Sequence, residues 1–226
     1  TSVYVFRTEL LKAALKEITP ANAQGEYYLT DCLEIIGRRA PIAVYCMEDS
    51  REAFGINDRV QLAQAQKIMQ QEINRQHMLA GVTVIDPENT YIEAGVSIGQ
   101  DTVIYPGSYI GTGSVIGKNC VLKGGNRLEK AVLGDKVTVN ASVLLSCSVG
   151  SGTTVGPNAY LRPGAQIGNN ARIGDFVEIK NANIGDGTKV SHLSYVGDAS
   201  VGSGCNIGCG AVFVNYDGKH KFRSVV

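Results

Sequence analysis

The sequence predicts a mainly β protein, a parallel β-helix of hexapeptide repeats that follows the tail of an α/β domain and a long linker helix. The main observation is that isoleucine, leucine or valine returns every sixth residue along much of the C-terminal two-thirds of the chain. This period fits neither an α-helix nor an ordinary amphipathic strand. Glycine follows many of these residues, so each unit can form one short strand and one tight turn. Three units would close a triangular coil, and stacked coils would bury the aliphatic residues in ladders.

The predicted β-helix occupies residues 82–226. Its aliphatic residues form three runs: Ile92, Ile98, Ile104, Ile110, Ile116 and Leu122; Val149, Val155, Leu161, Ile167, Ile173 and Ile179; Val201, Ile207 and Phe213. The rhythm slips at 124–133 and again at 179–184, where we expect a loop or a shortened corner that bulges out of the prism.

The segment before the repeat, residues 1–56, alternates strand and helix patterns. Residues 1–6 and 42–45 are predicted strands, and residues 9–18 and 31–39 are predicted helices. A segment of about 55 residues with two strands cannot enclose a substantial core. We therefore expect it to be the C-terminal part of a larger mixed α/β domain, and the whole chain to be a piece of a longer protein.

Residues 57–81 form the predicted linker, a polar helix rich in Gln and Ala. Asn57 or Asp58 is available as the N-cap, and Gly81 lies just beyond the C-terminal end. Such a helix spans about 30 Å and would act as a rigid strut between two domains.

The composition excludes several classes of function. The 21 basic and 21 acidic residues balance, so the net charge attracts neither nucleic acid nor an anionic membrane. No apolar stretch approaches the roughly 18 residues that span a bilayer, and no signal peptide is visible, so we expect a cytoplasmic protein. The six cysteines are scattered, and even Cys205 and Cys209 lack the spacing and companions of a zinc site.

A group of polar residues between 160 and 221 is not needed by a regular prism. It comprises Arg162, Lys180, Lys189, His192, Tyr195, Asn206, Asn215, Tyr216 and Lys221. Arg162 and Lys180 are eighteen residues apart, so three-unit coils would stack them one turn apart. Two such cations repel unless an anion such as phosphate lies between them. The alternative is that both are solvated surface charges.

His192 is one of only three histidines. A lone histidine is most often structural, but an imidazole can accept a proton near neutral pH, which an amine must lose before it attacks.

Several motifs together resemble one family. They are NAQGEYYLTD at 22–31, GINDR at 55–59, LRPG at 161–164, FVEIKN at 176–181, KVSHLSYVGDA at 189–199, NIGCG at 206–210 and NYDG at 215–218. In this order they are similar to the bifunctional bacterial glucosamine-1-phosphate acetyltransferase and N-acetylglucosamine-1-phosphate uridyltransferase, which makes UDP-N-acetylglucosamine. The resemblance covers nearly the whole chain and implies that residues 1–56 end a Rossmann-like uridyltransferase domain. It further implies a left-handed β-helix, a homotrimer and substrate sites between neighbouring prisms. It also implies that the product is used in peptidoglycan and lipopolysaccharide synthesis.

The resemblance also implies roles for individual residues. Carried over motif by motif, these are His192 as general base; Arg162, Lys180, Tyr195 and Asn206 as ligands of glucosamine 1-phosphate, with Lys221 a weaker candidate; Cys209, Asn215 and Tyr216 at the acetyl-CoA site; and Asn57 as a ligand of Mg²⁺ and the nucleotide sugar. Cys209 stands where relatives often carry Ala, which leaves its effect on coenzyme A binding open.

The implied reactions are acetyl transfer from acetyl-CoA to glucosamine 1-phosphate, and uridyl transfer from UTP to N-acetylglucosamine 1-phosphate with Mg²⁺. We expect this chain alone to lack the second activity, because the resemblance places the glycine-rich nucleotide loop before Thr1. Two alternatives remain. A non-catalytic scaffold with a degenerate nucleotidyltransferase domain would not need the LRPG, HLSY and NYDG motifs. A zinc-dependent carbonic anhydrase would need three converging histidines, and His77 on the linker leaves only His192 and His220 in the prism.

Overall fold

A computed structural model describes residues 3–226 of the chain. They divide into two compact units, one ending at Ala65 and the other spanning Gln66–Val226. We describe each unit by itself.

The first unit has two short helices, α1 (Thr8–Ala14) and α2 (Asp31–Gly37), and a 3₁₀ turn, η1 (Ser50–Ala53). Ala14, Cys32 and Ile36 form a small core between α1 and α2. Both predicted helices are confirmed, with shorter bounds than expected. The last turn of α1 ends in i→i+3 hydrogen bonds such as that from Glu17 N–H to Ala14 O, 2.9 Å, which close the helix before Pro20.

The strand predictions in this unit are wrong. Residues 42–45 contain no strand, and neither do residues 3–6, while residues 1 and 2 of that prediction lie outside the described residues. Val5 is 96% exposed and Val44 is 84% exposed. A strand needs a hydrogen-bonded neighbour, and within residues 3–226 neither segment has one.

Helix α3 (Arg59–Leu79) is the predicted linker helix. Asp58 caps its first turn by accepting a hydrogen bond from Gln61 N–H, 2.7 Å, at Oδ1. Gly81 follows its end with a left-handed φ of +93°, and the 21 residues of the helix span about 30 Å.

Two buried amides on α3 join the helix to the start of the β-helix. Asn74 Nδ2 donates to Pro87 O and Thr90 O at 2.9 and 3.0 Å, and Gln70 Nε2 donates to Thr90 O at 2.8 Å. These acceptors are the first residue of the 3₁₀ turn η2 (Pro87–Asn89) and the residue that follows it. The final turns of α3 are therefore fixed to the first coil.

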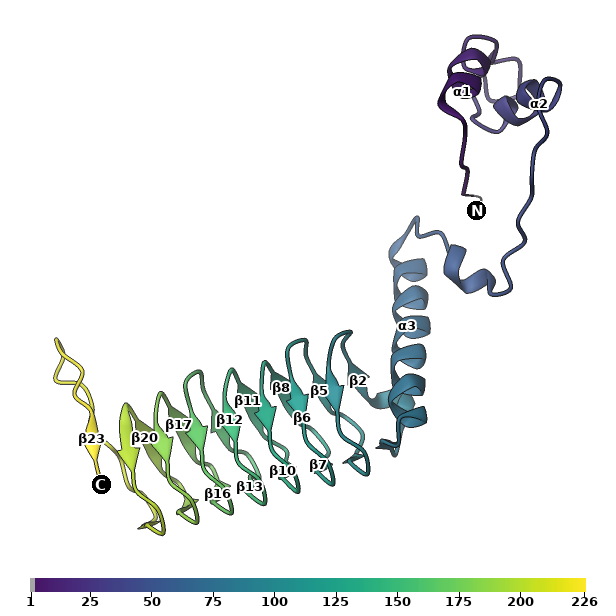
Figure 1. Cartoon of the computed structure of the whole chain (residues 1–226). Coiled ribbons are helices and arrows are strands. Elements are labelled where there is room, and N and C mark those ends of the chain that lie inside the picture. The colour runs from purple at the N-terminus through teal and green to yellow at the C-terminus, as the bar shows by residue number, and fades with distance from the viewer. Residues whose placement is uncertain (1–2) are drawn as a thin grey trace. The chain divides into compact units, whose positions relative to one another are not determined.

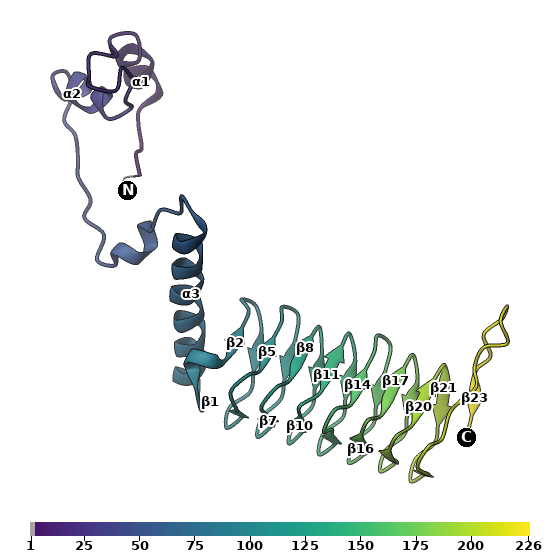
Figure 2. The ribbon, with the colours of Figure 1, turned by 180° about the vertical axis from the view of Figure 1, so that it is seen from behind.

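Residues 83–225 form a parallel β-helix of three sheets, confirming the predicted fold class (Figures 1 and 2). Sheet A contains β1 (Thr83–Val84), β4 (Val103–Ile104), β7 (Val121–Lys123), β10 (Thr138–Asn140), β13 (Thr154–Val155), β16 (Arg172–Asp175), β19 (Lys189–His192) and β22 (Asn206–Ile207). Sheet B contains β2 (Tyr91–Ile92), β5 (Tyr109–Ile110), β8 (Arg127–Glu129), β11 (Val143–Leu145), β14 (Tyr160–Leu161), β17 (Glu178–Lys180) and β20 (Tyr195–Gly197). Sheet C contains β3 (Ser97–Ile98), β6 (Val115–Ile116), β9 (Val132–Leu133), β12 (Ser148–Val149), β15 (Gln166–Ile167), β18 (Asn183–Ile184), β21 (Ala199–Val201) and β23 (Ser224–Val225).

The aliphatic residues of the repeat point inward and stack in register. On sheet A, for example, Ile104 lies level with Leu122, Leu122 with Val139 and Val155 with Ile173. Each of these side chains is at most 1% exposed. A single coil cannot bury its apolar side, so this ladder makes the coils depend on one another.

The slips in the repeat are shortened corners, and no loop bulges out at them. Leu128 and Leu133, like Ile179 and Ile184, are five residues apart, and each pair encloses a corner residue with positive φ, Lys130 (+49°) or Asn181 (+45°). Three further shortened corners were not anticipated; they contain Ala141, Ser146 and Asp198.

One corner carries a ladder of glycines, each following an inward residue of sheet C. They are Gly99, Gly117, Gly134, Gly150, Gly168, Gly185 and Gly202. A Cβ added at Gly150 would lie 2.5 Å from the carbonyl carbon of Gly168 in the next coil. The coils pack too closely here for any side chain.

After β22 the chain continues to Val212, which bridges Tyr195 of sheet B, and then leaves the prism and returns to it at β23. We call residues 214–223 the arm, which is the yellow excursion next to β23 in Figure 1. Tyr216 and Lys221 form an antiparallel bridge within the arm, and β23 then pairs with β21.

Candidate active site

His192 forms a close pair with a carboxylate that the sequence analysis did not single out. It is the last residue of β19, and Asp175, the last residue of β16, is its register partner. His192 Nδ1 lies 2.6 Å from Asp175 Oδ1, and both side chains remain accessible to solvent.

The chemistry of this pair fixes which imidazole nitrogen is free. The hydrogen bond from His192 lowers the pKa of Asp175 below its ordinary value of 3.8, with a smaller contribution from the charge of Arg172. At neutral pH Asp175 is therefore an anion that can only accept. The Nδ1–H of His192 donates to it, so Nε2 of the neutral ring carries the lone pair that can take a proton.

Arg162 and Lys180 lie in register on neighbouring strands of sheet B, as the eighteen-residue spacing predicts, because Leu161 pairs with Ile179. A protein carboxylate already lies against one of these two cations. The Arg162 guanidinium contacts Glu178 Oε1 at 2.8 Å, and this hydrogen bond raises the pKa of Arg162. A carboxylate of the protein supplies the opposite charge, with both side chains 38% exposed.

Two tyrosines complete this part of sheet B. Tyr160, Glu178 and Tyr195 occupy the same position on three successive strands. The Arg162 guanidinium lies over the Tyr160 ring, with Cζ 5.9 Å from the centroid. Cations, phenol rings and a carboxylate thus share one outward face.

Tyr195 lies along its own strand over Gly197. A Cβ at Gly197 would come within 2.2 Å of the Tyr195 hydroxyl oxygen. Gly197 is the register partner of Lys180, so the phenol hydroxyl is placed towards the strand that carries this cation. Any larger residue at position 197 would displace the ring.

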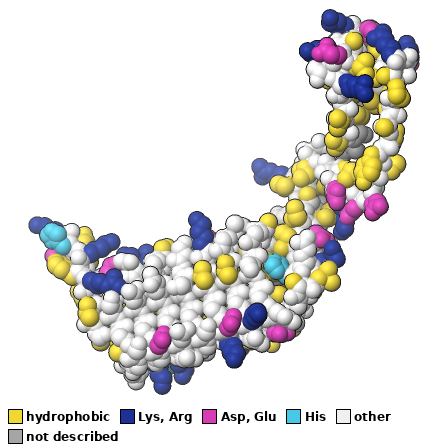
Figure 3. Space-filling model, in the orientation of Figure 1, with side chains coloured by type: hydrophobic (Ala, Val, Ile, Leu, Met, Phe, Trp, Pro, Cys, Tyr) yellow, Lys and Arg dark blue, Asp and Glu magenta, His cyan; other side chains and the backbone are white. Residues whose placement is uncertain are grey.

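Asn215, Tyr216 and Lys221 are all on the arm. Asn215 Nδ2 donates to Asp198 Oδ2 at 2.5 Å, and the Tyr216 hydroxyl donates to Gly218 O at 2.7 Å. Lys221 is exposed. Lys, Arg and His side chains gather on this part of the molecule (Figure 3).

Asn206 and Cys209 do not join the group on sheet B. Asn206 begins β22 of sheet A, where it pairs with Lys189, and Cys209 is exposed just beyond that strand. Neither forms a side-chain hydrogen bond within residues 3–226, and Asn206 belongs to a different sheet from Arg162. One chain therefore does not bring all the predicted ligands together.

Asn57 lies in the other compact unit, where its N–H donates to Gln61 Oε1 at 2.6 Å. Across residues 3–226 no group of three or more His, Cys, Asp or Glu side chains could hold a metal ion. A magnesium ion needs several oxygen ligands, so Asn57 and its described neighbours do not fit a complete Mg²⁺ site. We derive no step through this metal.

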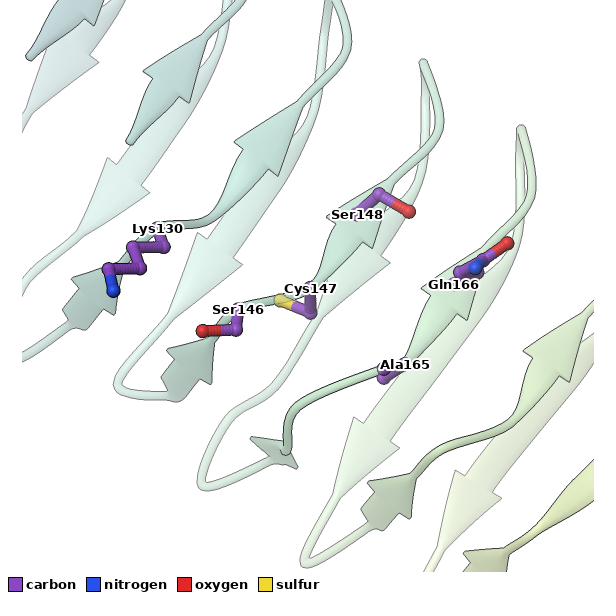
Figure 4. Close-up of a pocket in the computed structure, with 7 residues that line it drawn as sticks. Lys130, Ser146, Cys147, Ser148, Ala165 and Gln166 are labelled. Carbon is purple, nitrogen blue, oxygen red and sulfur yellow. The ribbon is translucent and has the colours of Figure 1, made fainter. Parts of the chain in front are cut away.

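Two hollows lie apart from the predicted residues. One, of about 340 Å³, is lined by residues on three successive coils around Cys147, among them Lys130 and Gln166 (Figure 4). Burial raises the pKa of Cys147 to about 12, so this thiol stays protonated and unreactive. The other, of about 440 Å³, lies between α3 and the first coils.

None of the helices within residues 3–226 has both the length and the apolar character needed to cross a membrane.

Sequence reasoning missed Asp175 and Glu178. A signal existed, because Asp175 precedes His192 by 17 residues and Glu178 precedes Tyr195 by 17. That spacing equals one coil with one shortened corner, and the rhythm between 179 and 184 indicates such a corner.

Comparisons with known proteins support the family resemblance. Residues 89–124 and 146–181 match the bacterial transferase hexapeptide (six repeats) family model. Along its full length the chain is 50% identical to the bifunctional protein GlmU of Clostridium beijerinckii, covering 50% of that protein. It is 55% identical to that of Levilactobacillus brevis, again covering 50%. The chain thus spans about half the length of the curated relatives it matches, and the resemblance inferred from the motifs is confirmed.

Solved structures with a similar repeat are more distant. The acetyltransferase domain of PglB from Neisseria gonorrhoeae, in complex with acetyl coenzyme A, has a TM-score of 0.39 and 18% identity, covering 54% of this chain and 63% of that one. UDP-N-acetylglucosamine acyltransferase from Campylobacter jejuni has a TM-score of 0.43 and 19% identity, with coverages of 57% and 66%.

Proposed function

We propose that the β-helix transfers an acetyl group from acetyl-CoA to the amine of glucosamine 1-phosphate. The observation that carries the proposal is the Asp175–His192 pair at the corner that leads from sheet A into sheet B, whose outer face holds Arg162 and Lys180. A free imidazole nitrogen and a pair of cations suit a substrate with an amine at one end and a phosphate at the other. The confirmed resemblance to the GlmU proteins supports the same assignment.

The reaction needs one proton acceptor and no covalent intermediate. His192 Nε2 takes a proton from the 2-amino group of glucosamine 1-phosphate while the amine nitrogen attacks the thioester carbonyl carbon of acetyl-CoA. A C–N bond forms, the C–S bond breaks, and the coenzyme A thiolate leaves with the proton returned by His192. The carboxylate of Asp175 stabilises the imidazolium between these two transfers.

Arg162 and Lys180 would bind the phosphate, and Tyr195 would contact the sugar. Arg162 offers a planar fork of donors that matches a phosphate, and Lys180 adds a point charge one strand away. Lys221 on the arm is a weaker candidate for the same phosphate. Asn215, Tyr216 and Cys209 would line the acetyl-CoA site.

We further propose a homotrimer with the sites between prisms. Asn206 lies on sheet A, whereas Arg162, Lys180 and Tyr195 lie on sheet B, so the two groups belong to different faces of one prism. A cleft between sheet A of one copy and sheet B of another would bring both faces to one substrate. Sedimentation equilibrium tests this, and a strict monomer at high protein concentration would contradict it.

For the whole protein we propose a second reaction, in which the phosphate of N-acetylglucosamine 1-phosphate displaces pyrophosphate from UTP to give UDP-N-acetylglucosamine. Asn57 would supply one amide oxygen for Mg²⁺ and the nucleotide sugar, with the other ligands from outside the described residues. These substrates also favour a cytoplasmic location.

The direct test is release of the coenzyme A thiol from acetyl-CoA in the presence of glucosamine 1-phosphate, measured on this chain and on the longest protein that contains it. Glucosamine without phosphate is the matched control and should react much more slowly, because it cannot use Arg162 and Lys180. Equal rates with both acceptors would overturn the assignment of the phosphate site, and no acetylation by the longer protein would overturn the proposed function.

A further inference from the structure

Asp198 is the one charged side chain that is buried within residues 3–226, with 8% of its surface exposed. It occupies a shortened corner between β20 and β21 and has a left-handed φ of +47°. A buried charge is costly unless it is well paired, so its partners indicate what it does.

Asp198 connects three parts of the chain. Its Oδ1 accepts from Asn181 Nδ2 at 2.6 Å, and its Oδ2 accepts from Asn215 Nδ2 at 2.5 Å. Its backbone N–H donates to Lys180 O at 3.0 Å, and its carbonyl accepts from Ser224 N–H at 3.1 Å. The strand of Lys180, the arm and the strand that follows the arm thus meet at one residue.

The carboxylate is charged at neutral pH. The hydrogen bond from Asn181 lowers the pKa of Asp198 below 3.8, and Asn215 and the charges of Lys180 and Lys221 lower it further. One of these lysines lies on the prism and the other on the arm, and the charge of each favours the ionised form of Asp198.

Apart from its two ends, the arm has little else to fix it. Phe213 N–H, just before the arm, donates to Tyr195 O at 3.0 Å, and Arg223, the last residue of the arm, donates from Nε to Ser200 Oγ and from Nη2 to Ala199 O, both at 2.9 Å. Between them, the bond from Asn215 to Asp198 is the one side-chain hydrogen bond that joins described residues 214–222 to the β-helix. The other bonds of this stretch, such as that from Phe222 N–H to Asn215 O, lie within the arm.

We propose that Asp198 is a positioning residue that fixes the arm beside Lys180, so that Asn215 and Lys221 are placed to bind acetyl-CoA and the sugar phosphate. The positioning role rests on the proposed function, whereas the attachment of the arm does not. A carboxylate is required because two amide N–H donors need two acceptor oxygens, and an asparagine offers only one.

The test makes two measurements on the 226-residue chain and its variants. One is amide hydrogen exchange of the arm, and the other is calorimetric binding of coenzyme A and of glucosamine 1-phosphate. In Asp198→Asn the arm should exchange about 10-fold faster, and the Kd of coenzyme A should rise by about 10-fold, the usual effect of losing a hydrogen bond to a charged group. The β-helix coils should keep their protection, which separates a loose arm from a misfolded chain.

Two variants sharpen the result. Asp217→Asn is the matched control on the arm itself, because Lys219 N–H and His220 N–H both donate to Asp217 Oδ1, at 2.8 and 2.6 Å, and an amide oxygen can replace it. It should leave exchange and affinity unchanged. In Asp198→Asn/Asn215→Asp the amide at 198 can accept from Asn181 and donate to the carboxylate at 215, so slow exchange of the arm should return.

Unchanged exchange in Asp198→Asn, or no recovery in the double variant, would overturn the attachment. Faster exchange with unchanged affinity for both ligands would overturn the positioning role. If the wild-type chain binds neither ligand, the positioning role is overturned, and the exchange rates alone then decide whether Asp198 holds the arm; the proposed function is decided separately by the acetylation assay on the longer protein.

Discussion

Sheets B and C of the β-helix share the same coils but differ outside the core. On both sheets the inward residues are buried aliphatics, such as Leu161 and Ile167. The residue that follows the inward position is glycine in seven successive coils of sheet C, whereas on sheet B the same position holds Glu, Gly, Leu, Arg or Lys. The fold therefore constrains the inward positions and the glycine corner, while the outer face of sheet B is free to carry a site.

The largest effect on activity is expected from removing the proposed general base, which the fold does not require. His192→Ala should lower acetyl transfer by about 10²- to 10⁴-fold, the range for losing a positioned general base. The loss should shrink as pH rises, because an amine that deprotonates in solution no longer needs the enzyme. Uridyl transfer by a full-length protein should not change.

Thermal unfolding of His192→Ala should match that of the wild type, since the ring is 52% exposed. Wild-type acetylation at pH 7 would show that His192 is not the base.

The next effect concerns the glycine corner of sheet C. Gly150→Ala should destabilise the β-helix by about 1–3 kcal/mol, because the added Cβ lies 2.5 Å from the backbone of the next coil and the coils must move apart. Denaturant unfolding measures this change. Gly208→Ala is the control: its Cβ has no atom within 4 Å, and a change beyond about 0.5 kcal/mol there would contradict the close-packing argument.

The sequence predicted those parts of the fold whose pairing or hydrogen-bond partners lie in the same turn or in the next copy of the same repeat. The period placed inward residues such as Ile104 correctly because each coil pairs with the next copy of the same pattern. The N-cap of α3 was predictable for a similar reason, since Asp58 bonds within its own turn. The segments 3–6 and 42–45 have strand-like composition, but a strand exists only with a neighbour, which a local pattern cannot reveal.

The contacts of the candidate site also fall into two groups, those that the sequence predicted and those that it did not. The register of Arg162 with Lys180 followed from a coil of eighteen residues. The pairing of His192 with Asp175 required a coil of seventeen, and Asp198 required knowing that the arm returns to that corner. Because each shortened corner shifts every later register by one residue, the first contact follows from spacing only once the corner between 179 and 184 is placed. The contact of Asp198 with the arm does not follow from spacing.

Arg162→Ala tests whether the cations of sheet B bind phosphate. It should raise the KM for glucosamine 1-phosphate by about 10- to 100-fold at every pH, because a guanidinium does not titrate in this range, and kcat should change less. Arg127→Ala is the matched control for Arg162→Ala, because Arg127 also lies on sheet B and also forms an ion pair with a carboxylate, that of Glu129, at 2.6 Å. Equal effects of the two variants would show that Arg162 is only a surface ion pair.

The smallest expected effect separates the hydrogen bond of Asp175 from its charge. Asp175→Ala should lower acetyl transfer by about 10-fold at pH 7, because His192 loses the acceptor that keeps the proton on Nδ1 and leaves Nε2 free. Asp175→Asn should retain more activity, since its amide oxygen can still accept from Nδ1–H. The lowered pKa of Asp175 means that its stabilising bond is present at neutral pH and is lost only as pH falls through that lowered value. The order of activities, wild type above Asp175→Asn above Asp175→Ala, should therefore hold between about pH 6 and 8.

Nitrogen NMR of the ligand-free chain should show the Nδ1–H tautomer of His192 in the wild type and its loss in Asp175→Ala. An Nε2–H tautomer in the wild type would leave no lone pair at Nε2, and Asp175 would then be a surface partner without a part in proton transfer.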